Sequence, residues 1–188
     1  MNGTSNITAD DREVLGDGIA KLNYGLNIGV SYKNWDINMF LYGIGGQKIL
    51  SYSQRNLTFN NVSGVGYRNI LKSSYEEAWR VDKPNNEHSR LTSNDQNQNR
   101  RVSDYFIHNG DFLRFQNIQI GYSVPRQLLR PLKMENVRLS AGIENVFIIS
   151  GYKFGNPEIG GNSINQQGLD TGGYALPRIV SFGISVGF

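Results

Sequence analysis

The feature that most constrains this chain is a strict alternation of apolar and polar residues in five separate runs. Such alternation places apolar side chains on one face of a β-strand and polar ones on the other. The purest run covers residues 22–32, where every second position is asparagine, glycine or serine. The apolar positions of the runs are Leu22, Tyr24, Leu26, Ile28, Val30 and Tyr32; Trp35, Ile37, Met39 and Leu41; Ile118, Ile120, Tyr122 and Val124; Val137, Leu139, Ala141 and Ile143; and Val180, Phe182, Ile184, Val186 and Phe188. The sequence therefore predicts an all-β fold.

One run breaks its own alternation. Leu113 and Phe115 fall on the opposite parity to Ile118. An extra residue in one strand of an antiparallel pair shifts the parity beyond it. We therefore predict a β-bulge near Gln116.

Short and long connections alternate along the chain. The first two runs are joined by a two-residue turn at Lys33, and the third and fourth by about a dozen residues around Arg126. The other connections cover residues 43–111 and 150–173. A compact soluble domain rarely contains such long irregular connections, whereas outer-membrane barrels have periplasmic turns on one rim and long extracellular loops on the other. We predict an antiparallel transmembrane β-barrel segment over residues 22–188, preceded by a separate segment over 1–21.

Composition agrees with this class and excludes others. The mean hydropathy of −0.43 is low, as expected where every second strand residue faces a polar lumen. The absence of cysteine excludes a disulfide framework and thiolate metal sites. The net charge of +3 is spread along the chain, so nucleic-acid binding is not expected. Residues 1–6 contain no export signal, so we expect a processed chain or a fragment of a longer protein.

Aromatic residues gather beside the short turns. Tyr32, Trp35 and Tyr122 occupy these positions, where the aromatic girdle of a membrane barrel lies. A half-exposed soluble sheet would show the same alternation of apolar residues. The alternative is therefore a soluble or cell-surface β-sandwich binding module, adhesin-like in function.

Six local motifs follow one another along the chain. Residues 10–16 resemble a DDRTVIG-like lead-in, 103–114 an SDRFIEDGSFLR-type motif, 120–125 LGYTLP, 144–147 QNLF, 155–158 YDPE, and 176–178 QPR. In this order they resemble the C-terminal barrel region of the SusC/RagA family of TonB-linked (TonB-dependent) outer-membrane transporters.

This resemblance implies a function as well as a fold, with an extracellular lead-in over residues 1–21 and no plug domain in this chain. The chain would supply the last five or so strands of a barrel of about 22 strands, with its C-terminus at the periplasmic side of the bacterial outer membrane. Such a transporter imports glycan or peptide fragments with a SusD-like surface lipoprotein, and is coupled to the TonB complex through the missing N-terminal part. The run Val180, Phe182, Ile184, Val186 and Phe188 resembles the signal read by the barrel-assembly machinery.

Catalytic and metal-binding patterns are weak. His88 and His108 have no neighbouring ligand cluster in the sequence, and the adjacent Glu76 and Glu77 are expected in a solvated helical turn. We therefore predict no enzyme and no cofactor. Oxygen-bearing residues near the N-terminus are the only calcium candidates, because Ca²⁺ prefers oxygen ligands at short intervals; these are Asn6, Asp10 and Asp11.

The long connection 43–111 contains three aromatic residues that could stack on a sugar or peptide. They are Tyr67, Tyr75 and Trp79. Binding residues commonly lie on loops held by a rigid scaffold. The alternative is that these rings pack the connection against itself.

Overall fold

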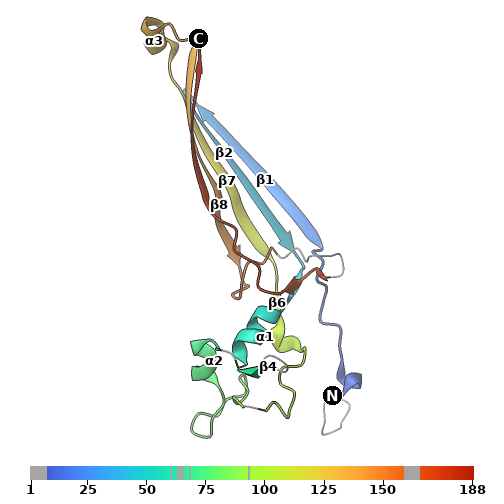
Figure 1. Ribbon diagram of the computed structural model, residues 1–188. Helices are drawn as coiled ribbons and strands as arrows, with labels where there is room; N and C mark the ends of the chain where they lie inside the picture. The colour runs from blue at the N-terminus through green and yellow to red at the C-terminus, as the bar shows by residue number, and fades with distance from the viewer. Residues whose placement is uncertain (1–7, 60, 63–65, 68, 93, 159–165) are drawn as a thin grey trace.

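A single antiparallel sheet of five long strands dominates the computed structural model, which describes residues 8–59, 61–62, 66–67, 69–92, 94–158 and 166–188. These strands are β1 (Leu22–Tyr32), β2 (Trp35–Gly45), β7 (Phe112–Ser123), β8 (Asn136–Ser150) and β10 (Ile179–Gly187). They pair in the order β1-β2-β7-β8-β10, so each long strand lies beside the next one along the chain (Figure 1). The predicted antiparallel all-β fold is confirmed.

Short elements occupy the connections. They are η1 (Ala9–Asp11), β3 (Lys48–Ser51), α1 (Tyr52–Thr58), β4 (Asn61–Val62), β5 (Gly66–Tyr67), α2 (Lys72–Glu77), η2 (Asp104–Phe106), β6 (Ile107–Asn109), α3 (Arg126–Leu129), η3 (Arg130–Leu132) and β9 (Leu169–Asp170). Strand β3 pairs with β6 and also with β9, which joins the two long connections in one small sheet. We call the part of the molecule formed by these two connections, residues 46–111 and 151–178, the loop end. It lies at one end of the long strands, and α3 lies at the other (Figure 1). No helix in the described part of the chain has the length and apolar character to cross a membrane.

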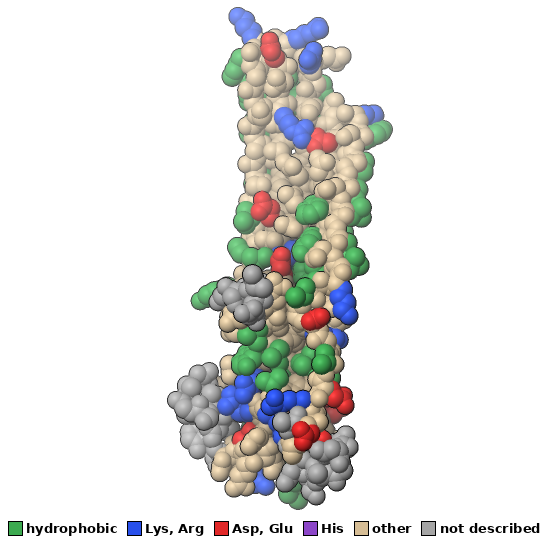
Figure 2. Space-filling view, turned by 90° about the vertical axis from the view of Figure 1, so that its right-hand side faces the viewer, with side chains coloured by type: hydrophobic (Ala, Val, Ile, Leu, Met, Phe, Trp, Pro, Cys, Tyr) green, Lys and Arg blue, Asp and Glu red, His purple; other side chains and the backbone are tan. Residues whose placement is uncertain are grey.

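The strand register gives the long sheet two chemically distinct faces. One cross-strand row consists of Ile28, Met39, Ile118, Ile143 and Val180. The next row, on the opposite face, consists of Gly29, Asn38, Gln119, Gly142 and Ser181. Figure 2 shows the polar face, with hydrophobic side chains mainly along its margins over the strands. The predicted division of apolar and polar faces therefore holds in these rows across all five strands, whereas toward the loop end the polar face also carries Tyr42, Ile44 and Phe112.

The bulge lies where the parity break predicted it. Phe40 pairs with Asn117 while the next residue, Leu41, pairs with Phe115, so Gln116 has no partner on β2. The ladder between β7 and β8 is also irregular here, and Asn145 adopts a positive φ of 53°. Beyond the bulge, Phe115 again lies in a row with the apolar residues.

Strand β2 runs further than the sequence predicted: the alternation ended at Leu41, but β2 continues to Gly45. Strand β10 is shifted by one residue, since it begins at Ile179 and ends at Gly187, before the predicted Phe188. The connections between long strands therefore cover residues 46–111 and 151–178. A close approach explains why glycine does not end the pairing: a Cβ on Gly43 would lie 2.4 Å from Cζ of Tyr24. The Tyr24 ring crosses above Gly43, and its hydroxyl donates to the carbonyl oxygen of Phe112 at 3.2 Å.

Buried apolar residues gather at the loop end rather than along the strands. Ile49 and Phe106 are fully buried, and Phe59, Ala78 and Tyr152 are nearly so. The long sheet forms a single layer (Figure 1). A β-sandwich requires a second sheet packed on the apolar face, and the described residues place none there.

Candidate functional site

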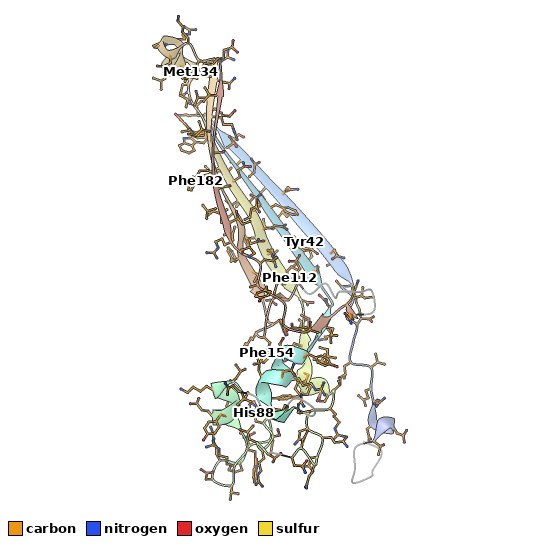
Figure 3. The ribbon with its side chains drawn as sticks, in the orientation of Figure 1. Tyr42, His88, Phe112, Met134, Phe154 and Phe182 are labelled. Atoms are coloured by element: carbon orange, nitrogen blue, oxygen red, sulfur yellow. The ribbon has the colours of Figure 1, made fainter. Side chains whose placement is uncertain are left out.

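The apolar face of the long sheet is exposed over its full width. Phe182 is 83% exposed, and Val30, Ile184 and Leu26 are more than half exposed. Figure 3 places Phe182 along the strands, Phe154 and His88 at the loop end and Met134 at the opposite end. A continuous apolar surface of this kind marks a membrane or protein contact. This face is the surface that meets lipid in a transmembrane barrel.

The aromatic residues beside the short turns form one cross-strand row. Tyr32 pairs with Trp35, and Trp35 pairs with Tyr122. The Trp35 and Tyr122 ring centroids are 4.6 Å apart. The ammonium of Lys33 lies 5.2 Å from the centroid of the Tyr32 ring. The row therefore presents rings toward the apolar face and a cation at the strand ends.

An ion pair crosses the polar face near the same end. Arg138 of β8 donates to both carboxylate oxygens of Asp36 of β2, each at 2.7 Å, across the intervening strand β7. Gly121 of β7 lies beneath the pair, and a Cβ there would approach Nη2 of Arg138 to 2.3 Å. The alternation placed both charges on the polar face, but their contact depends on a register that the sequence did not reveal.

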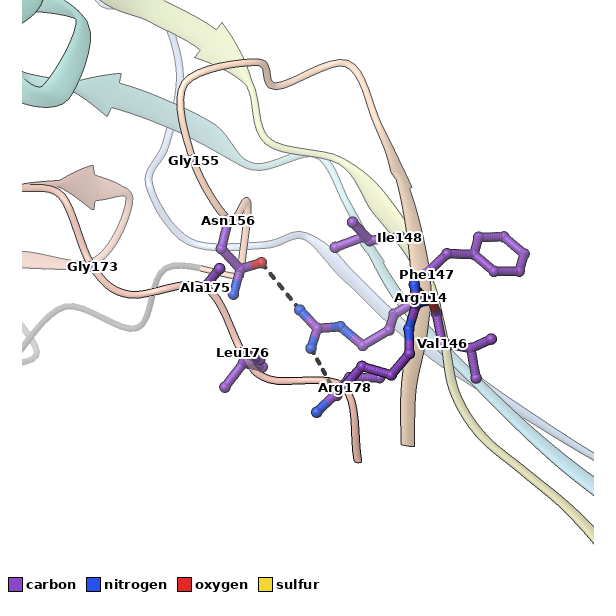
Figure 4. A pocket seen from close by; sticks show the side chains of 11 residues that line it. Arg114, Val146, Phe147, Ile148, Gly155, Asn156, Gly173, Ala175, Leu176 and Arg178 are labelled. Atoms are coloured by element: carbon purple, nitrogen blue, oxygen red, sulfur yellow. Dashed lines mark hydrogen bonds between the residues drawn. The ribbon is translucent and has the colours of Figure 1, made fainter. Parts of the chain in front are cut away.

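A cavity of about 280 Å³ lies at the rim where the strands meet the loop end (Figure 4). Its walls are mainly apolar and come from β8 and the segment before β10: Val146, Phe147, Ile148, Ala175 and Leu176. Arg178 also lines it and donates to the carbonyl oxygen of Val146 at 2.5 Å. The cavity can hold a small apolar group beside a guanidinium.

Arg114 of β7 closes one side of this cavity. Its side chain is buried and donates to the Oδ1 atoms of Asn145 at 3.2 Å and of Asn156 at 3.1 Å (Figure 4). It also forms an ion pair with Glu158 at 2.7 Å. Because Asn156 and Glu158 belong to the connection after β8, Arg114 ties that connection to the sheet.

A buried polar cluster joins the two long connections. The Tyr152 hydroxyl is hydrogen-bonded to the Asp170 carboxylate and, at 2.7 Å, to the Ser51 hydroxyl. Ser51 also accepts from the amide of Gln54 at 3.1 Å and so caps α1. Burial, together with the carboxylate acceptor, raises the pKa of Tyr152 above its usual value, so the phenol stays a donor.

Both histidines at the loop end are hydrogen-bonded. His108 Nε2 lies 2.5 Å from Oε1 of Gln54, and burial lowers the pKa of His108. His88 lies 3.1 Å from the Tyr105 hydroxyl and 3.2 Å from a carboxylate oxygen of Glu77. Both imidazoles therefore act as hydrogen-bonding partners within the loop end.

The candidate stacking residues differ in their exposure to solvent. Tyr75 of α2 is 58% exposed, and the Arg80 guanidinium covers one ring face at 4.6 Å from the centroid. Trp79 follows α2 and is half-buried. The side chain of Tyr67 lies outside the described residues. Ligand stacking by these three residues stays a prediction.

The acidic residues of α2 and of the lead-in are placed as solvated groups. Glu76 and Glu77 are exposed on α2, as predicted. The calcium candidates Asp10 and Asp11 lie in η1, and the Asp11 carboxylate accepts from the Thr8 amide at 2.8 Å. Asn6 lies outside the described residues. Within the described ranges, no group of three or more histidines or carboxylates could hold a metal ion.

Proteins of known class are similar to this chain in sequence over its whole length. No protein-family profile matches the chain. Its whole length is 26% identical to TonB-dependent receptor P3 of Formosa agariphila and 29% identical to TonB-dependent receptor SusC of Bacteroides thetaiotaomicron. The chain is a homologue of the TonB-dependent receptors. It spans 18% of the length of P3 and 17% of SusC.

Solved structures agree with this relationship to the TonB-dependent receptors. The RagAB peptide importer in its closed-closed state matches 98% of the chain with a TM-score of 0.81 at 20% identity, and 19% of its own chain is covered. The open-open state gives a TM-score of 0.77. The fold is thus that of a segment of this barrel transporter. The resemblance to the C-terminal region of the SusC/RagA family, predicted from the six motifs, is confirmed.

Proposed function

We propose that this chain forms part of the wall of an outer-membrane TonB-dependent transporter that imports glycan or peptide fragments. A SusD-like surface lipoprotein would deliver the solute, and the TonB complex would supply energy through a part of the protein outside this chain. The observation that carries the proposal is the sheet itself. It presents an exposed apolar face to one side and a polar face to the other over five strands, in a homologue of TonB-dependent receptors.

The sheet has two outer edges that need partners. Among the described residues, β1 pairs only with β2, and β10 pairs only with β8. Each backbone group left open to hydrocarbon costs several kcal/mol, and single-chain barrels have about eight strands or more. The remaining strands of a larger barrel therefore fit both edges. Produced alone, the chain should aggregate; a soluble, cooperatively melting monomer without detergent would contradict the proposal.

The long connections are proposed to lie outside the cell, and the turns at Lys33 and Arg126 in the periplasm. Both long connections leave the sheet at the same end and pack together through β3 and β9. Asn97→Cys and Asn34→Cys in the full-length protein, treated with an impermeant thiol reagent on whole cells, test this. We expect labelling at Asn97→Cys alone. Labelling of Asn34→Cys alone would reverse the topology.

Transport requires its own measurement. Cells lacking the full-length receptor are complemented with the intact protein or with a version whose TonB-contacting segment is deleted. We expect uptake of labelled oligosaccharides or peptides only with the intact protein, while surface binding persists in both. Equal uptake in the two strains would refute energised import and leave a surface binding role.

A further inference from the structure

The turn between β7 and β8 concentrates positive charge. Arg126, Arg130 and Lys133 are all exposed there, and Glu135 is the only acid in residues 124–135. Lys33 of the neighbouring turn adds a fourth cation, and the Ser123 amide donates to the Asn34 carbonyl at 2.8 Å, which holds the two turns together. None of these cations forms an ion pair within the described part of the chain. We call Lys33, Arg126, Arg130 and Lys133 the basic turn.

Two leucines accompany these charges. Leu128 is 64% exposed and Leu132 62% exposed, one on α3 and the other on η3. Leu129 between them is buried, which anchors α3 at the strand ends. The segment is therefore fixed by one leucine and offers two others, together with its cations, to an external partner.

The order of chemistry along the sheet indicates what that partner is. The apolar rows lead to the aromatic row of Tyr32, Trp35 and Tyr122, and the basic turn follows immediately beyond it. Figure 2 shows lysine and arginine side chains at this end of the molecule. Hydrocarbon, carbonyl region and charged headgroup follow the same order in a bilayer, and cations near the boundary extend toward the headgroups.

We propose that the basic turn binds the phosphate headgroups of anionic phospholipids in the periplasmic leaflet, with Leu128 and Leu132 inserted at the boundary. The inference rests on the proposed membrane location and adds the charge class of the lipid. Electrostatic attraction to an anionic surface explains four unpaired cations, and the continuity of the turn with the lipid-facing rows explains the exposed leucines.

The test uses the full-length receptor in nanodiscs of phosphatidylcholine, with or without phosphatidylglycerol. Native mass spectrometry reports the lipid retained, and thermal unfolding reports stabilisation. We expect the wild-type protein to retain phosphatidylglycerol preferentially and to melt at a higher temperature in its presence. Arg126→Gln, Arg130→Gln and Lys133→Gln together should lower that preference at least about fivefold, the factor associated with a single basic residue at an anionic surface.

A matched variant removes the same charge elsewhere. Arg12→Gln, Arg90→Gln and Lys153→Gln replace exposed cations outside the turn, and should leave the lipid preference unchanged. An equal loss in both variants, or no preference in the wild type, would overturn the proposal while the inserted barrel still supports the proposed function. Stabilisation by inorganic phosphate in neutral detergent would also overturn it, in favour of a free phosphate site. Failure of the wild type to insert into any nanodisc would instead refute the membrane location.

Discussion

The long strands and the loop end of this molecule use apolar residues in opposite ways. Along the strands, side chains such as Phe182 and Ile184 point outward and remain exposed. At the loop end, Ile49 and Phe106 are fully buried and form a small core of the kind found in water-soluble proteins. The proposed membrane location accounts for this difference, because two solvents would then act on one chain. Lipid would accept the apolar surface of the strands, whereas water drives the loop end to bury its apolar side chains.

Polar groups differ between the two regions as well. The long sheet pairs its inner strands through backbone ladders, with a bulge at Gln116, and places charges such as Asp36 and Arg138 on the polar face. The loop end is joined through side chains from distant segments, including Tyr152 and Asp170. We therefore expect the stability of the long sheet to depend on lipid, and the stability of the loop end to depend on contacts among its own side chains.

Removing a core side chain from the loop end should give the largest effect. Phe106→Ala deletes a ring that lies against Phe59 and Tyr105, with centroid distances of 6.2 and 5.1 Å. We expect a local destabilisation of about 3–5 kcal/mol, measured as faster amide exchange in β3 and β6. Tyr75→Ala, at an exposed aromatic residue, should change exchange little. Equal acceleration in β7 and β8 would mean that both regions unfold as one unit.

A charge on the lipid face should have the next largest effect. Ile28→Arg in a central apolar row should destabilise the inserted barrel by about 2–4 kcal/mol, whereas Leu139→Arg, in the aromatic row, should cost about 0–1 kcal/mol. Asn27→Arg is the matched control on the polar face. Unfolding in detergent or lipid vesicles measures each cost. Similar costs for Asn27→Arg and Ile28→Arg would show that both faces are packed.

Removing the contacts of Arg114 that join the long sheet to the connection after β8 should have a smaller effect. Arg114→Met keeps an apolar stem but removes the ion pair with Glu158 and the bond to Asn156. We expect a loss of about 1.5–3 kcal/mol, seen as faster proteolysis within residues 151–158. Arg90→Met, at an exposed arginine outside that connection, serves as control. Unchanged proteolysis in Arg114→Met would show that the connection is held by other contacts.

The smallest predicted effect is a pH dependence of the loop end. Because burial lowers the pKa of His108 from its usual 6.5, the folded state binds fewer protons than the unfolded state. The associated stability is therefore complete above that usual pKa and is lost as pH falls through the lowered one. The protection factors of β3 amides, which are corrected for the slower intrinsic exchange at low pH, should fall on acidification, and should fall less in His108→Gln. A pH dependence of stability that His108→Gln leaves unchanged would assign the effect to groups other than His108.

The long sheet was largely predictable from the sequence, because its faces and its bulge are determined by residues close together along each strand. Alternation fixed the faces of Ile28 and Ile118, and a parity break between Phe115 and Ile118 located the bulge. The strand ends were less predictable, since glycines such as Gly43 remain within the ladder when a neighbouring ring covers them.

The site contacts at the loop end were not predictable from one sequence. Arg114 and Glu158 each belong to a motif that the sequence showed, but 44 positions separate them and no periodicity connects them. Tyr152, Ser51 and Asp170 come from three distant segments whose meeting depends on the tertiary fold. Stacking by Tyr75 and Trp79 stays a prediction for the same reason.

The bulge at Gln116 also limits which insertions and deletions the long strands can accept during evolution. Deleting that residue would turn Arg114 and Phe112 toward the hydrocarbon and Leu113 and Phe115 inward, because side chains alternate at every position. Insertions and deletions are therefore tolerated in the connections. A single-residue insertion or deletion within a strand instead moves every side chain between that position and the end of the strand to the opposite face of the sheet. Relatives should therefore show length variation in the connections and few single-residue gaps within the long strands, including at the position of Gln116.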